Sequence, residues 1–173
     1  MKTYDQNSTQ TGLSETRISR IREQGYVCHT DAEIKDLAFG NRFAYRLCTT
    51  MLIFGVAFAN IPLLSFMMVI AFFGVILPNH PFDYIYNLVL SKRMNKPKLP
   101  PRSNQLKFAC SIATLWIGGT IYMFYSGLTN WGFILGASLI VVATLVGTID
   151  FCIPSKIYNA IFLRNAKAIK YSA

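Results

Sequence analysis

Two long apolar stretches dominate the chain. They run from Leu47 to Pro78 and from Phe108 to Ile149, and neither contains a Lys or an Arg. A single bilayer crossing needs about 20 apolar residues, so each stretch has room for two helices. The pattern therefore predicts an all-α fold: a polytopic membrane protein whose four transmembrane helices form two hairpins. The expected crossings are Phe43–Ala59, Leu63–Leu77, Phe108–Tyr125 and Gly132–Ile149.

The basic residues predict the orientation of these crossings. All 17 Lys and Arg residues lie before Leu47, between Lys92 and Lys107, or after Pro154. Cationic loops remain on the cytoplasmic side of a membrane. We therefore expect both termini to be cytoplasmic, in a bacterial inner membrane. The cations would face anionic lipid head groups, and no nucleic-acid partner is expected, although the net charge is +9.

The first 39 residues differ from the rest and are expected to form a cytoplasmic arm. Residues 1–12 are polar. Leu13–Gln24 predicts either a short basic amphipathic helix that lies on the membrane and stops at Gly25, or a solvated helix or loose arm. Thr30 and Glu33 have the spacing of a capping box, which predicts the start of another helix. We expect Gly40-Asn41 to break that helix before the membrane domain, residues 40–173.

The membrane domain contains an apparent internal repeat. Phe43-Ala44 and Phe108-Ala109 open the two hairpins, and Ile-Tyr-Asn follows each hairpin, at 85–87 and 157–159. This predicts a first repeat over 40–93, a Pro-rich tether over 94–104 and a second repeat over 105–170. The segments Phe82–Arg93 and Ile157–Lys170 combine apolar, aromatic and basic residues, which is typical of helices that lie in the membrane interface.

Small residues recur at helical spacing within the predicted crossings. Such residues let neighbouring helix backbones approach closely, either within one bundle or between two copies of the chain. The predicted helix-packing positions are Gly132, Gly136, Ala143, Gly147, Gly55 and Ala59.

Few residues suggest chemistry. Several thiol and polar side chains map near the expected cytoplasmic ends of the crossings, where ionisable groups are candidates for function. The sequence contains no motif for a catalytic residue, a metal site or a cofactor, so none is expected. The alternative is that these cysteines only pack and that Asp150 pairs with a nearby cation. The candidate cluster is Cys152, Cys110, Cys48, His80, Asp83 and Asp150.

Some of these motifs resemble those of a known family. His80-Pro81 and the segment Phe151-Cys152 to Tyr158 resemble a family of uncharacterised small bacterial four-helix membrane proteins. That family has Phe-Cys-x-x-Cys-x-x-Tyr at the second place, whereas this chain has Ser155 instead of the second cysteine. The resemblance implies a fold and a location, and no activity.

Two functions remain compatible with the sequence. The first is a non-enzymatic membrane subunit or scaffold, which packs against another membrane protein or a second copy of itself. The alternative is a small permease or thiol-linked redox partner, which handles a sulfur compound at the cytoplasmic face.

Overall fold

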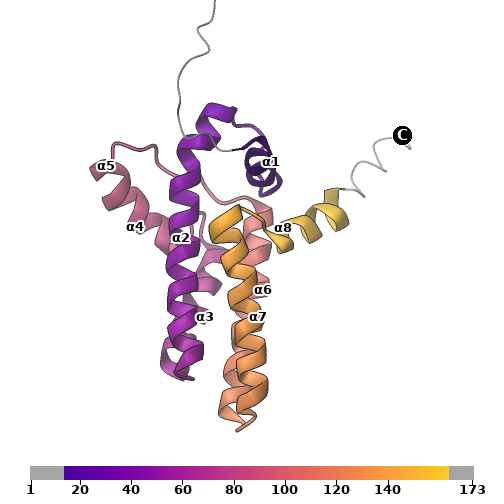
Figure 1. Cartoon of the computed structure of the whole chain (residues 1–173). Helices are drawn as coiled ribbons and strands as arrows, with labels where there is room; N and C mark the ends of the chain where they lie inside the picture. The colour runs from indigo at the N-terminus through magenta and orange to yellow at the C-terminus, as the bar shows by residue number, and fades with distance from the viewer. Residues whose placement is uncertain (1–13, 164–173) are drawn as a thin grey trace, which may run out of the picture.

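The computed structural model describes residues 14–163, and every regular element among them is a helix (Figure 1). This confirms the all-α class for the described part of the chain. The predicted polar residues 1–12 and the end of the segment Ile157–Lys170 lie outside it. Four helices are long: α2 (Asp31–Ala57), α3 (Ile61–Ile76), α6 (Asn104–Tyr125) and α7 (Thr129–Ile149). The others are α1 (Glu15–Glu23), α4 (Pro81–Ile85), α5 (Ser91–Arg93) and α8 (Ile153–Tyr158), with π-helical turns at Tyr86–Leu90 and Asn159–Leu163.

The four long helices form a bundle. Most contacts join α2 to α3, α3 to α6, α6 to α7 and α7 back to α2, so α2 and α6 lie diagonally opposite each other. The centre of the bundle is apolar. Its buried residues are Ala44, Leu52, Val56, Leu64, Met67, Ala71, Phe82, Ile117, Phe124 and Leu139.

The long helices are paired as two hairpins, α2–α3 and α6–α7. Their two turns lie at one end of the bundle, and α1, α4, α5 and α8 lie at the other, which we call the short-helix end (Figure 1). There α4–α5 and α8 project to opposite sides of the bundle. The first turn falls between the first two expected crossings: the Asn60 side chain accepts a hydrogen bond from the Leu63 amide, and Pro62 occupies the first turn of α3.

The N-terminal arm confirms two predictions and corrects one. Helix α1 ends just before Gly25, whose φ of +104° suits glycine, and the Thr30–Glu33 capping box is present. The break expected at Gly40-Asn41 is wrong, because α2 runs through both residues. Gly40 instead lets Tyr86 approach: a Cβ at Gly40 would lie 2.7 Å from the Tyr86 ring.

The expectation of four crossings is supported only in part. Among the described helices, α6 and α7 are long and apolar enough to cross a membrane. Helix α3 joined to Pro81–Arg93 would be a third, although the two are bent by 81°. Alone, α3 has 16 residues, about 24 Å of helix against a hydrocarbon core of about 30 Å. Helix α2 begins with polar turns and carries Arg42 and Arg46.

Candidate functional site: a thiol-lined cavity

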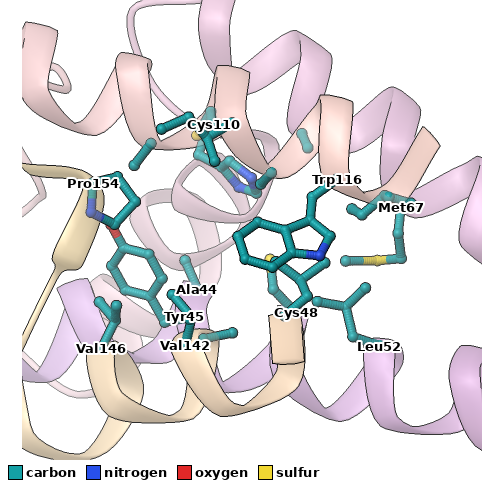
Figure 2. Close-up of a pocket in the computed structure, with 18 of the residues that line it drawn as sticks. Ala44, Tyr45, Cys48, Leu52, Met67, Cys110, Trp116, Val142, Val146 and Pro154 are labelled. Carbon is teal, nitrogen blue, oxygen red and sulfur yellow. The ribbon is translucent and has the colours of Figure 1, made fainter. Parts of the chain in front are cut away.

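A cavity of about 110 Å³ lies between the helices of the bundle. All four long helices line it (Figure 2). His80, Arg102 and Cys152, which come just before α4, α6 and α8, also line it, as does Pro154 within α8. Most of the wall is aliphatic, and Trp116 is fixed in it because its indole N–H donates to the Leu135 carbonyl at 3.1 Å. The polar and sulfur-bearing side chains of the wall are Tyr45, Cys48, Met67, His80, Arg102, Cys110, Trp116 and Cys152.

Four of the six predicted candidates meet at this cavity. Cys48 comes from α2, Cys110 from α6, Cys152 from the N-cap of α8 and His80 from the N-cap of α4. All three cysteines are free thiols. The fourth cysteine, Cys28, is exposed on the arm.

Asp83 contributes to the cavity indirectly, by pairing with Arg102, which was not among the predicted candidates. The Arg102 guanidinium lines the cavity, and its Nε and Nη2 donate to the two Asp83 carboxylate oxygens at 2.6 and 3.0 Å. The Arg102 and Asp83 side chains are 4% and 2% exposed. Burial lowers the pKa of Arg102, but the Asp83 charge more than offsets this and holds that pKa well above its usual range. The cavity therefore contains a permanent, paired cation.

The tether between the hairpins places Arg102. The Asn87 side chain binds the tether through two hydrogen bonds: it accepts from the Leu99 amide at 2.8 Å and donates to the Leu99 carbonyl at 3.3 Å. The Arg102 amide donates to the Pro78 carbonyl at 2.7 Å. Asn87 is the asparagine of the first Ile-Tyr-Asn, so this repeated motif has a structural role. In the second copy, Asn159 likewise holds the arm, by donating to the Glu23 carbonyl at 2.8 Å.

His80 is buried and neutral. Its Nδ1 accepts from the Phe82 amide at 3.3 Å, and its own amide donates to Asp83 at 3.1 Å, so His80 and Asp83 form a capping box. Burial lowers the pKa of His80 to about 3, and the nearby Arg102 charge acts in the same direction. Because Nδ1 accepts, the ring hydrogen of the neutral form belongs to Nε2.

Cys152 is a protonated thiol. Ser155, which replaces the second cysteine of the expected motif, donates from Oγ to the Cys152 sulfur at 3.1 Å. Burial raises the pKa of Cys152, although the Ser155 hydrogen bond opposes this. At neutral pH the thiol is therefore not a preformed nucleophile.

Tyr45 has a polar atom without a partner. Its hydroxyl is buried and forms no hydrogen bond with any described residue. Its ring lies beneath the Arg102 guanidinium, 5.4 Å from the ring centroid to Cζ. The Arg102 Nη1 atom has only a long contact of 3.9 Å with the Cys110 sulfur.

Asp150 belongs to a different cluster. Its side chain pairs with Arg42, at 2.7 Å from Nε to Oδ1, and with Arg17 of the arm at 3.2 Å. Arg17 and Arg20 also donate to the Thr148 and Ile149 carbonyls at the end of α7. Asp150 therefore joins the arm to the bundle, and it does not line the cavity.

The predicted helix-packing residues lie on different surfaces. Gly132, Gly136 and Gly55 are buried, and a Cβ at Gly136 would lie 2.6 Å from the Val56 side chain. Gly147 is buried with ordinary clearance around it. Ala59 lies in the first turn with a φ of +44°, and Ala143 lines the cavity.

Many residues that line the cavity occupy corresponding sequence positions in the two hairpins. Counted from Phe43 and Phe108, Tyr45 corresponds to Cys110. Counted back from Tyr86 and Tyr158, His80 corresponds to Cys152. The same counting pairs further lining residues: Ala44 with Ala109, Cys48 with Ala113, Leu52 with Ile117, Met67 with Leu139, Ile70 with Val142 and Ala71 with Ala143.

A family model described as Domain of unknown function (DUF4395) matches residues 39–162. The chain belongs to this family. The match covers both hairpins and the cavity, and excludes α1 and the first turns of α2. No curated protein matches the chain, and no solved structure matches it. Between residues 14 and 163, no three His, Cys, Asp or Glu side chains are grouped so that they could hold a metal ion.

Arg102, Tyr45 and Trp116 were not predicted from the sequence. For Tyr45 a signal was present, because counting from Phe43 and Phe108 aligns it with Cys110, a predicted candidate. In the sequence Arg102 is one of several cations in the tether, so nothing distinguishes it. In the structure the hydrogen bonds of Asn87 to Leu99 hold the tether so that Arg102 faces the cavity.

Proposed function

We propose that this member of the DUF4395 family is an integral membrane protein with a binding site for a small sulfur compound. In this proposal all four long helices cross the bilayer, and the short-helix end is cytoplasmic. The distribution of Lys and Arg supports that orientation, because the loops at the opposite end have none. Large exposed apolar side chains on α2 and α3 support contact with lipid, among them Phe54, Phe58, Phe66, Phe72 and Ile76.

The two hairpins are, in this proposal, copies related by an approximate twofold axis along the membrane normal. The paired lining positions support it, as does the shared order of long helix, long helix, short helix and π-helical turn. The apolar side chains exposed on α4–α5 and α8 would then lie in the same interface. They include Ile85, Leu88, Val89, Ile157 and Ile161. The cavity would lie on the axis, where parallel-repeat membrane proteins place their sites.

The observation that carries the proposed function is the convergence of three thiols on one cavity. Cys48, Cys110 and Cys152 come from three different elements, yet all face the same space. Thiols and the Met67 thioether are soft, polarisable groups that suit a sulfur-bearing ligand. A cavity of 150 Å³ holds a ligand the size of benzene, so 110 Å³ suits a molecule of about five non-hydrogen atoms.

The scaffold interpretation remains a prediction with less support. It relied on apolar faces that could pack against another protein. Contact with lipid accounts for those faces equally well, and it does not explain a cavity that contains three thiols and a paired cation.

Disulfide exchange with a small neutral probe tests the proposed function. Dimethyl disulfide has four non-hydrogen atoms and transfers a methylthio group to a thiol, with methanethiol leaving. In the folded, detergent-purified chain, peptide mapping by mass spectrometry should find this group on at least one of Cys48, Cys110 and Cys152. Glutathione disulfide, which is too large for the cavity, should modify only Cys28.

A filled cavity provides the control. Ala71→Leu adds volume to the wall and should suppress the modification of the cavity thiols while leaving Cys28 reactive. If dimethyl disulfide modified only Cys28 and also left the fluorescence of the cavity residue Trp116 unchanged in a Trp131→Phe chain, the cavity would not admit small sulfur compounds and the proposal would be wrong. The fluorescence is needed because buried, protonated thiols react slowly even with a compound that has entered.

A further inference from the structure

The cavity has two chemically different ends. Arg102, His80 and Cys152 lie at the short-helix end, where the tether and α8 close the bundle. Leu52, Met67, Ile117 and Leu139 lie deeper in the bundle and offer no hydrogen-bond donor. A ligand would therefore be held with a polar group towards the short-helix end and an apolar or soft group towards the interior.

The polar end contains one hydroxyl without a hydrogen-bond partner and one guanidinium nitrogen with a weak acceptor. The Tyr45 hydroxyl is buried with no partner among the described residues. The Arg102 Nη1 atom carries two N–H groups, and its one contact is the 3.9 Å approach to the Cys110 sulfur. An unsatisfied buried hydroxyl is costly, so its position beside a weakly paired guanidinium nitrogen favours a ligand that supplies acceptors. The neutral His80 adds an Nε2–H at the same end of the cavity.

The cation favours an acceptor that carries negative charge. Asp83 occupies the Nε and Nη2 edge of Arg102, which leaves Nη1 on the other side of the guanidinium. Charge-assisted hydrogen bonds from a guanidinium to an oxyanion are about twice as strong as those between neutral groups. The soft groups deeper in the cavity, Cys48 and Met67, favour sulfur next to that oxyanion.

We propose that the ligand is a small sulfur oxyanion, such as a thiosulfate or a small sulfonate, whose oxygens accept from the Arg102 Nη1 group and the Tyr45 hydroxyl. Its sulfur or carbon end points towards Cys48 and Met67. This inference rests on the proposed function, since it names the class of compound for the same cavity, and it requires no covalent step.

Tyr45→Phe is the variant that isolates the inference. It removes a hydroxyl that has no partner in the free protein and keeps the ring beneath Arg102, so the fold should not lose stability. Tyr86→Phe is its matched control. The Tyr86 hydroxyl is also buried without a partner, but Tyr86 packs against Phe39, Phe43 and Gly40, outside the cavity.

The chain contains its own reporter of binding. Trp116 lines the cavity, and the other tryptophan, Trp131, is exposed at the far end of the bundle. In a Trp131→Phe background, the fluorescence of Trp116 can be titrated with sodium thiosulfate and sodium sulfate in the detergent-purified full chain. We expect thiosulfate to change the fluorescence and to bind more tightly than sulfate. Tyr45→Phe should weaken thiosulfate binding about tenfold, the effect of losing one hydrogen bond to a charged group, and Tyr86→Phe should leave it unchanged.

The possible outcomes separate this inference from the proposed function. Equal thiosulfate affinity in the Tyr45→Phe and Tyr86→Phe proteins, sulfate bound as tightly as thiosulfate, or no binding of thiosulfate would each overturn the inference. If dimethyl disulfide still modified the cavity thiols in that case, the proposed function would stand and only the oxyanion class would be wrong. If neither compound entered the cavity, both proposals would fail.

Discussion

Single residues at the short-helix end determine the chemistry of the cavity. Asp83 orients Arg102, Ser155 donates to Cys152, and His80 caps α4 with its own ring nitrogen. Each of these contacts is buried, so the groups cannot exchange their partners for water without cost. The cavity therefore presents a fixed set of donors and thiols.

The buried His80 should make folding stability depend on pH. Its pKa is about 3 in the folded chain, whereas an exposed histidine titrates near 6.5. Between these values the unfolded chain binds the proton and the folded chain does not, so stability falls as pH falls from about 6.5 towards 3. The slope from this one group approaches about 1.4 kcal/mol per pH unit. His80→Asn keeps an N-cap acceptor and should flatten the dependence of the thermal unfolding midpoint on pH between 7 and 5.

Absolute stability is not the readout for this variant, because it also loses the packing of the His80 ring on Phe82. The slope is the readout. Identical slopes for His80→Asn and the unaltered chain would show that His80 does not titrate within a buried site.

At the scale of elements, close approaches between helices hold the bundle around the cavity. Gly136 on α7 faces Val56 on α2, and Gly55 on α2 faces Leu64 on α3. Each glycine lets a neighbouring side chain fill the place of its missing Cβ. These contacts fix the distance between α2 and its neighbours α3 and α7 beyond the deep end of the cavity.

Gly136→Ala tests this packing. The new Cβ would lie 2.6 Å from the stiff, β-branched Val56, and such overpacking costs about 1–3 kcal/mol. The matched control is Gly119→Ala on α6, where no neighbouring atom lies within 4 Å of the new Cβ. In a helix interior that change should be neutral or gain about 0.5–1 kcal/mol. Thermal unfolding in detergent should therefore rank Gly119→Ala above Gly136→Ala, and equal midpoints would contradict close packing at Gly136.

The sequence predicted the local elements better than the site. Caps and turns such as Thr30–Glu33 and Asn60-Ile61-Pro62 depend on neighbouring residues, so their signals are local. The inward turn of Arg102 depends on Asn87, which is distant in the sequence and holds the tether. For the same reason Gly40 suggested a helix break, although its role is to accommodate Tyr86 from another element.

The apolar composition of the chain predicts more membrane crossings than the lengths of the helices support. The apolar stretches indicate two helices each, but only α6 and α7 have both the length and the apolar character of a crossing on their own. The polar first half of α2 and the shortness of α3 place the other two near the limit. Their assignment as crossings is therefore part of the proposal.

At the scale of the whole molecule, the proposed arrangement places the polar end of the thiol-lined cavity on the cytoplasmic side of the membrane. Arg102, Cys152 and the arm all lie at the short-helix end, and the two hairpin turns lie at the other (Figure 1). Leu128, in the turn between α6 and α7, is half exposed there and should face the opposite side of the membrane.

Sided labelling of membrane vesicles tests this central claim most directly. The unaltered chain carries the exposed thiol of Cys28 on the arm, and a Cys28→Ser, Leu128→Cys variant carries the outward marker instead. Both are treated with a small, negatively charged, membrane-impermeant methanethiosulfonate in inside-out and right-side-out vesicles. We expect Cys28 to be modified only in inside-out vesicles and the marker at position 128 only in right-side-out vesicles, while Cys48, Cys110 and Cys152 stay unmodified because the reagent is too large for the cavity. Cys28 labelled from the outer face, or the marker labelled from the inner face, would contradict the account.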